Sequence, residues 1–514
     1  MEVEEANPIS TVEYGGAHLL KDQPISNDVI LDEFHFDSVF PPTELAQIPT
    51  RDPSSLASFE LLRKYGNGFK KLKGEIILSD KSAHESTPAV SHRLSTEEIM
   101  RVAGARYVQF PTQMSDDYLM PGHPFGFALS AAGLSEDETR DVELAHLLLA
   151  AAEKVSYRQY DRASRLLLRC EWISSAKANP VQRVVFRFAE ALQERIEKEI
   201  GRATGKGVFE PNIDEIFQGF IISSHLPFLT VYKQIPFTQI LLFTGIQAIV
   251  EKIAFQRKIH LIDIGIRCGV QWTILMQALA ERRDCPIELL KITAVGSTGI
   301  EETGKRLANV AESLNLPFSF KPVLLPDMND VKDELFETED DEYVIIFAPH
   351  ILGTMISRPT CLENLMRVIR NLYPSIMVVI ETEANHNSPS FLNRFIEALF
   401  FYSAYYDSFD TCLKQYDADR MRMETVFGDA IRNIVAEEGA ERNIRNVTMD
   451  VWRAFFARYR MVEIGFSEAA LSQASLVVKR FACRSSCTID KNGKCVIVGW
   501  KGSPIHSLSL WKFR

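Results

Sequence analysis

The stretch 259–280, "IHLIDIGIRCGVQWTILMQALA", has the pattern of an apolar strand, a turn with two glycines and an amphipathic helix. In a parallel α/β sheet such a turn lies at the carboxyl end of a strand, where ligands bind and where glycines let the backbone approach them. The turn therefore supplies the candidate ligand-binding residues, which are an acid, two glycines and two side chains at the start of the helix: Asp263, Gly265, Gly269, Gln271 and Trp272.

The spacing of these residues is only partly that of a cofactor site. Their pattern departs from the dinucleotide fingerprint G-x-G-x-x-G. Arg267 stands where a methyltransferase that uses S-adenosylmethionine would have a further glycine, and its side chain competes for the space of an adenosyl group. We therefore expect a vestigial cleft and no cofactor. For Gln271, Trp272 and also Trp452, packing is favoured over ligand binding, because buried aromatic side chains dominate core energetics.

A second polar group, Asn385, His386 and Asn387, follows the apolar run "SIMVVI", where a catalytic group is expected in this architecture. No set of nucleophile, base and orienting group accompanies it. Hydrogen bonds to neighbouring backbone explain the same residues, and we favour that structural role.

Basic residues gather around "TMDVWRAFFARYRM", residues 448–461. At helical spacing, the apolar side chains of this segment form one buried face and leave its arginines outward. Such arginines can bind the phosphates of DNA, although a solvated basic face is the commoner outcome. The candidate DNA-binding residues are Arg442, Arg445, Arg453, Arg458 and Arg460.

The elements that must position these residues change along the chain. Residues 1–134 are rich in proline, serine and acids, and we expect a variable, largely disordered region with a short helix after the capping box of Ser95 and Glu98. Residues 135–255 predict a mainly helical cap, whose first helix begins at a capping box of Ser135 and Glu138. In residues 256–514 strands alternate with helices, which predicts a mostly parallel, doubly wound sheet of the Rossmann type with helical insertions. Asn492-Gly493 predicts a type I′ hairpin on an antiparallel edge.

Composition excludes several classes of protein. Hydrophobic residues make up 46% of the 514 residues, and the sequence contains no apolar run long enough to span a bilayer, so no membrane contact is expected. The acidic start "MEVEEANPIS" does not resemble a signal peptide. A net charge of −11 argues against a generally basic surface. Eight cysteines are too dilute for a disulfide framework, and Cys483, Cys487 and Cys495 lack a clear fourth zinc ligand, so no metal is expected.

Five blocks in sequence order resemble the plant GRAS family, over residues 138–514. "IHLID" with "GVQWTILMQALA" is similar to the VHIID motif and its continuation. "SSHLPFLTVYKQIPFTQILLFTGIQAIVEKI" and "ETGKRLANVAESLNLPFSF" resemble the flanking leucine-rich regions. "VVIETEANHNSPSFLNRFIEALFFYSAYYDSFD" resembles the PFYRE block, and "IRNIVAEEGAERNIR" its continuation. "GWKGSPIHSLSLW" resembles the SAW motif, with Leu510 in place of alanine.

The resemblance implies a regulator of transcription in the plant nucleus, with a methyltransferase-like core beneath a helical cap. Its partners would be other transcription factors or GRAS proteins, including a homodimer or heterodimer. We favour regulation through protein contacts over direct, sequence-specific DNA binding, and both over an active methyltransferase. The N-terminal region contains no intact DELLA or TVHYNP motif, so binding to a gibberellin receptor is not expected.

Overall fold

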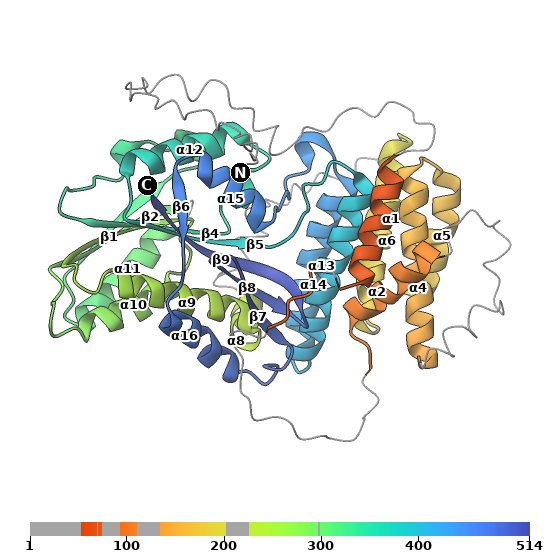
Figure 1. Cartoon of the computed structure of the whole chain (residues 1–514), viewed down its shortest axis with the longest axis horizontal. Coiled ribbons are helices and arrows are strands. Elements are labelled where there is room, and N and C mark those ends of the chain that lie inside the picture. Colours follow the sequence, from red (N-terminus) through yellow and green to blue (C-terminus); the bar gives the residue numbers. More distant parts are fainter. Residues whose placement is uncertain (1–52, 69, 75–92, 110–133, 202–225, 297–298) are drawn as a thin grey trace, which may run out of the picture.

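The computed structural model describes residues 53–68, 70–74, 93–109, 134–201, 226–296 and 299–514. These residues build a mixed sheet with helices on both faces and a helical layer beside it (Figure 1). The strands are β1 (Lys258–Ile264), β2 (Leu289–Gly296), β3 (Phe318–Leu324), β4 (Tyr343–Pro349), β5 (Ile376–Thr382), β6 (Met461–Ile464), β7 (Cys487–Asn492), β8 (Cys495–Trp500) and β9 (Ser503–Phe513).

The strand order is β3-β2-β1-β4-β5-β9-β8-β7, with β6 beside β9. Strands β1 to β5 are paired in parallel, and β9 joins β5 antiparallel, with Ile380 opposite Leu508. The order 3-2-1-4-5 is that of a Rossmann-type sheet. The predicted parallel sheet with an antiparallel edge is therefore confirmed.

Alternate residues of the strands belong to two different cores. Along β4, Ile345 and Phe347 pack into one core and Val344 and Ile346 into the other, as the two-residue period of a strand requires. One face is covered by α9 (Pro236–Lys252), α10 (Val270–Ala280), α11 (Ile300–Ser313) and α16 (Glu468–Lys479), and the other by α12 (Pro359–Leu372) and α15 (Met449–Arg458).

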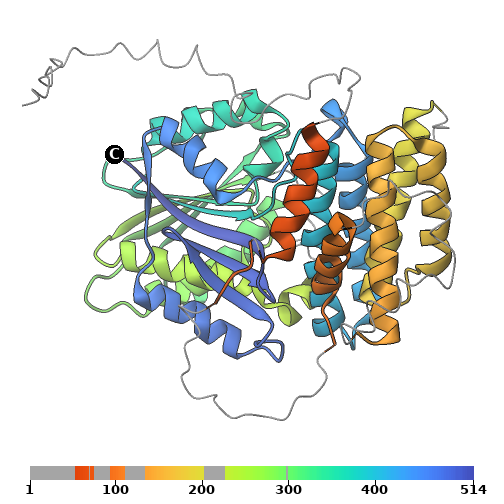
Figure 2. The ribbon, with the colours of Figure 1, turned by 45° about the vertical axis from the view of Figure 1, so that its right-hand side comes forward.

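The helical layer stands at the β9 side of the sheet (Figure 2). Its helices are α1 (Pro53–Gly66), α2 (Thr96–Gln109), α4 (Glu136–Ser156), α5 (Tyr160–Ile173), α6 (Pro180–Glu199), α13 (Phe391–Cys412) and α14 (Asp417–Ala436), with α8 (Leu226–Gln234) against α14. The central helix is α13, which is buried on nearly every side and also contacts β8 and β9. The predicted capping box of Ser135 and Glu138 begins α4, and that of Ser95 and Glu98 begins α2.

The N-terminal region contributes more structure than its composition predicts. Helix α1 was not expected, yet Leu62 is buried and the ring of Tyr65 stacks on Phe400 of α13 at 4.0 Å between centroids. The Tyr65 hydroxyl also donates to Glu397 (2.7 Å). The expectation of a largely disordered segment is therefore wrong for α1, because its few apolar residues find partners on α13. The acidic and apolar segment 29–40 lies outside the described residues.

The C-terminal hairpin is formed by β7 and β8 where it was predicted, but its turn is different. Asn492 pairs with Cys495, so the central residues of the turn are Gly493 and Lys494. Gly493 has a positive φ of 63°, and Lys494 does not. A type I′ turn needs positive φ at both central residues, whereas glycine at the first of them is typical of type II′.

No helix among the described residues is long and apolar enough to cross a membrane.

Gly304 allows α11 to lie close to β3. A Cβ atom added there would be 2.3 Å from Cδ1 of Phe320. We expect Gly304→Ala to lower the free energy of unfolding by about 1–2 kcal/mol, because the cost of overpacking exceeds the gain in helix propensity. Urea unfolding measures the change. The control is Gly465→Ala, whose Cβ would meet nothing within 4 Å. Equal stability of the two variants would contradict the close contact.

Candidate functional site

The predicted ligand turn joins β1 to α10, and its acid is completely buried. Trp272 Nε1 donates to Asp263 Oδ2 at 2.7 Å, and Gln271 Nε2 donates to the same oxygen at 3.3 Å. Burial raises the pKa of Asp263 to about 7, although the hydrogen bond from Trp272 and the charge of Arg267 act in the opposite direction. Trp272 is buried and packs edge to face on Phe347. The structure thus brings Asp263, Gln271 and Trp272 together as an internal cluster.

The two glycines of the turn have packing explanations. Gly265 has a φ of 101°, a conformation that favours glycine, and Ile351 lies against it. A Cβ on Gly269 would be 3.0 Å from Thr303 of α11, so this glycine allows close contact between helices. Thr303 also donates its hydroxyl to the carbonyl of Arg267 (2.7 Å), which ties the turn to α11.

The end of β2 does not provide the ribose contact of a nucleotide site. In this architecture an Asp or Glu near the end of the second strand binds the ribose hydroxyls. Here β2 ends at Gly296, and the sequence continues as Ser297, Thr298 and Gly299. Neighbouring side chains account for Asp263, Gly265 and Gly269, and the vestigial cleft stays a prediction.

A polar cluster that sequence reasoning missed lies at the ends of β4 and β5. Burial raises the pKa of Glu381 to about 8, and its Oε1 accepts hydrogen bonds from the backbone of Leu352 (3.0 Å) and Gly353 (3.1 Å). His350, with an unusual positive φ of 54°, packs edge to face on His506 of β9 at 4.9 Å. Burial lowers the pKa of both histidines, that of His506 to about 3.

Glu381 and His350 line a hollow with Arg445 and Asn446. Its volume of ≈ 10 Å³ corresponds to about one water molecule, far below the roughly 300 Å³ of ordinary ligand pockets. The available signal was Glu381 itself, an acid near the end of an apolar strand, as Asp263 is. Its partners were not predictable from sequence, because β4, β5 and β9 meet only in the folded sheet.

The five candidate arginines do not form one outward surface. Arg442 is 1% exposed and donates to the carbonyl of His386, so the expectation that it faces outward is wrong. Arg445 is partly buried and donates to the carbonyls of Arg442 (2.9 Å) and Gly439 (2.7 Å). Both residues belong to the loop before α15, so helical spacing did not determine where they point.

Helix α15 itself agrees better with the sequence pattern. Trp452, Phe455 and Phe456 are buried, as predicted. Arg453 binds the carboxylates of Glu463 (3.0 Å) and Asp450 (2.8 Å), which offset its charge. The two arginines at the end of the helix are exposed: Arg458 and Arg460.

Comparisons with known proteins place the chain in a family. A model of the GRAS domain family matches residues 144–512. The DELLA protein RGL1 of Arabidopsis thaliana is 31% identical over 386 residues, covering 74% of this chain and 72% of that protein. RGL3 of the same plant is 30% identical over 380 residues, covering 73% and 70%. The crystal structure of SCL7 from Oryza sativa matches with a TM-score of 0.63 and 25% identity, covering 72% of this chain and 99% of that one.

The chain belongs to the GRAS domain family. Membership supports a role in the regulation of transcription, as the resemblance of the five blocks implied. The matched residues include the Asp263 turn, the hollow at Glu381 and the arginines around α15, whereas α1 and α2 precede the match.

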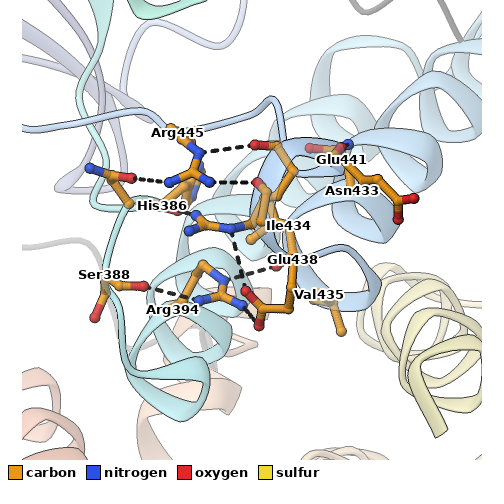
Figure 3. A network of polar contacts seen from close by, with 12 residues as sticks. His386, Ser388, Arg394, Asn433, Ile434, Val435, Glu438, Glu441 and Arg445 are labelled. Atoms are coloured by element: carbon orange, nitrogen blue, oxygen red, sulfur yellow. Dashed lines mark hydrogen bonds and ion pairs between the residues drawn. The ribbon is translucent and has the colours of Figure 1, made fainter. Parts of the chain in front are cut away.

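One block of this GRAS domain, residues 431–445, is organised around a buried charge cluster (Figure 3). Glu438 pairs with Arg394 of α13, with Arg195 of α6 (2.9 Å) and with Arg442 (3.7 Å). Arg394 is fully buried and also donates to the carbonyls of Ile434 and Ser388, both at 3.0 Å. Glu438 therefore joins the two helices of the cap layer to the loop that leads to α15.

The cluster also explains the polar group at 385–387. The His386 amide donates to the carbonyl of Asn446 (2.9 Å), and its Nδ1 meets the Asn446 side chain at 3.1 Å. The side-chain oxygen of Asn387 accepts a hydrogen bond from Arg445. Asn433 binds the same loop from α14, through the amides of Asn443 and Ile444. These contacts support the structural role that was favoured for His386 and Asn387.

The electrostatics of the cluster predict that the stability of the fold depends strongly on Glu438. Burial raises the pKa of Glu438, but Arg394 and Arg195 outweigh it and the net pKa is lowered. Glu438→Gln leaves Arg394 and Arg442 buried without a countercharge. We expect a loss of about 2–3 kcal/mol in unfolding free energy, less than for a fully buried pair because Glu438 is partly exposed. Urea unfolding measures it, with the exposed Glu441→Gln as the matched control. Equal stability of the two variants would show that the arginines need no carboxylate.

The raised pKa of Asp263 predicts a dependence of stability on pH. The folded state binds this proton more tightly than the unfolded chain, whose Asp pKa is about 3.9. The stabilisation is complete below that value and is lost as pH rises through about 7. Asp263→Asn cannot ionise and keeps an acceptor for Trp272. It should therefore lose less stability than the wild type between pH 4 and pH 8, by on the order of a few kcal/mol.

Urea unfolding at each pH tests the Asp263 prediction. The matched control is Asp284→Asn, because Asp284 is exposed and lies in the segment that follows α10. Parallel curves for Asp263→Asn and the wild type would contradict the raised pKa.

Proposed function

We propose that this GRAS protein is a nuclear regulator of transcription that acts through contacts with other transcription factors or with a second GRAS chain. The observation that carries the proposal is an exposed apolar face on α5. Trp172 is 94% exposed, and Leu168, one helical turn before it, is 64% exposed. Large apolar side chains that gather on a surface mark protein interaction sites, and tryptophan is enriched among the residues that dominate binding energy.

The position of α5 supports the same proposal. The opposite side of the helix packs into the cap through Leu166, Leu167 and Cys170, so Leu168 and Trp172 are presented by an ordered element. Helix α5 lies at the outer edge of the helical layer, away from the sheet (Figure 1). A partner that binds this face therefore leaves the covered sheet and its helices undisturbed.

Direct binding to DNA is the second candidate. It rests on Arg458 and Arg460, which are exposed at the end of α15. The other three candidate arginines are less suited to bind phosphate. Arg442 is buried, Arg445 is partly buried and bonded to backbone carbonyls, and Arg453 is paired with carboxylates. Selection from a random duplex library at physiological salt distinguishes the candidates, since base readout resists salt better than phosphate attraction alone. Enrichment of one site that is lost in Arg458→Glu with Arg460→Glu would favour direct binding.

The protein-contact proposal makes a specific prediction for α5. The full chain tethered to a promoter should change reporter transcription, and Trp172→Asp should reduce that effect several-fold. The reason is that a tryptophan that becomes buried against a partner contributes about 2 kcal/mol or more to binding. The measurement is reporter output at equal protein level. Phe255→Asp is the matched control. Phe255 is also exposed (87%), but it follows α9, which covers the sheet and is not part of the helical cap. A tethered wild type without effect on transcription would overturn the proposed function.

A further inference from the structure

The outward face of α5 carries positive charge beside its apolar side chains. Arg162 and Arg165 are exposed, and Arg169 is half-buried. They share one side of the helix with Leu168 and Trp172, because residues three, four or seven positions apart along a helix point the same way. This face therefore presents a row of guanidinium groups that leads to an exposed tryptophan.

The positive charge of this face exceeds the negative charge near it. Residues 158–173 contain four arginines and two acids, Asp161 and Glu171, so their net charge is +2. Arg162 donates to Gln159, a neutral side chain, at 3.3 Å. Among the described residues no ion pair joins Arg162 or Arg169 to a carboxylate. A surface with these charges and an apolar anchor fits a partner segment that is both acidic and apolar.

The N-terminal region of the same chain contains a segment of that composition. Residues 29–40, "VILDEFHFDSVF", include three acids and no lysine or arginine, and three of their apolar residues are phenylalanines. Alternation of acids with apolar side chains is typical of activation segments, which bind other proteins. The segment lies outside the described residues, and its composition is complementary to α5 in charge and in apolar character.

The connection to the described structure is long enough for this segment to reach α5. Twelve residues, 41–52, separate it from α1, which packs on α2, while α2 packs on α4 and α4 on α5. Adjacent packed helices lie about 8–10 Å apart, so these three steps amount to about 30 Å or less. Twelve extended residues span up to about 40 Å. A tether of this length gives an effective concentration on the order of millimolar, so weak contacts suffice for binding.

We propose that segment 29–40 binds in cis to the outward face of α5. Its aromatic side chains cover Leu168 and Trp172, and its acids pair with Arg162 and Arg169. A partner that binds α5 must then displace the segment, so the N-terminal region regulates access to the contact site. This regulatory consequence rests on the proposed function, whereas the docking itself is tested without it.

Acrylamide quenching of tryptophan fluorescence in the purified full chain tests the docking. The chain contains five tryptophans, and four of them are buried, so acrylamide that reaches a tryptophan reaches Trp172: the buried ones are Trp272, Trp452, Trp500 and Trp511. We expect weak quenching in the wild type. The quenching constant should rise several-fold in Asp32→Lys with Asp37→Lys, because the reversed charges are repelled by the arginines of α5. Adding Trp172→Phe to both proteins should abolish the difference, since it removes the exposed reporter.

The matched control is Asp116→Lys with Asp117→Lys, which makes the same change of charge elsewhere in the N-terminal region and should be quenched as the wild type is. Circular dichroism confirms that the variants are folded. Equal quenching of the wild type and of Asp32→Lys with Asp37→Lys would overturn the proposal. Protection that disappears on dilution would also overturn it, because the segment of a second chain would then cover α5. Quenching measures the occupancy of α5 directly, so the docking stands or fails independently of the tethered reporter, which tests the proposed function.

Discussion

Burial of both faces of the sheet is the constraint on which the rest of this structure depends. Strands covered by helices on each side must be apolar along their length, and in β4 and β5 nearly every residue is buried. Several of the buried polar groups lie near strand ends, among them Asp263, Glu381 and His350. The loss of water there raises the pKa of the two acids and lowers that of the histidine. The unusual chemistry of these residues follows from the architecture and needs no bound ligand to explain it.

Ion pairs as well as apolar packing hold the helical cap to the loop that leads to α15. Arg394 on α13 binds Glu438 and two backbone carbonyls from inside the protein, where an unpaired guanidinium would be costly. Through Arg442 and Arg445 the same network holds the loop that precedes α15. The five candidate arginines thus differ in role. Arg442 and Arg445 hold the loop before α15, Arg453 is paired with carboxylates, and Arg458 and Arg460 are exposed.

The sequence pattern predicted those structural features that depend only on neighbouring residues. Capping boxes at Ser95 and Ser135, the apolar period of β1 and the glycine of the hairpin turn were readable from neighbouring residues. Strand β3 has a weaker sequence pattern because Pro322 interrupts it. The structure explains the proline, since β3 is an edge strand that needs no donor on its outer side. The burial of Arg442 and the pairing of Arg394 with Glu438 depend on contacts between different segments. The spacing of residues along the sequence does not predict such contacts.

The position of β9 in the sheet has a consequence for folding. Its neighbour β5 lies far earlier in the chain, and Ser507 of β9 bonds the carbonyl of Glu381 across a separation of 126 residues. Until β9 arrives, β5 is the open edge of a parallel sheet and exposes the run "IMVVI" with unpaired backbone. An unfinished chain in this condition pairs readily with strands of other molecules. The C-terminal antiparallel strands therefore protect the nascent protein against aggregation, in addition to completing its core.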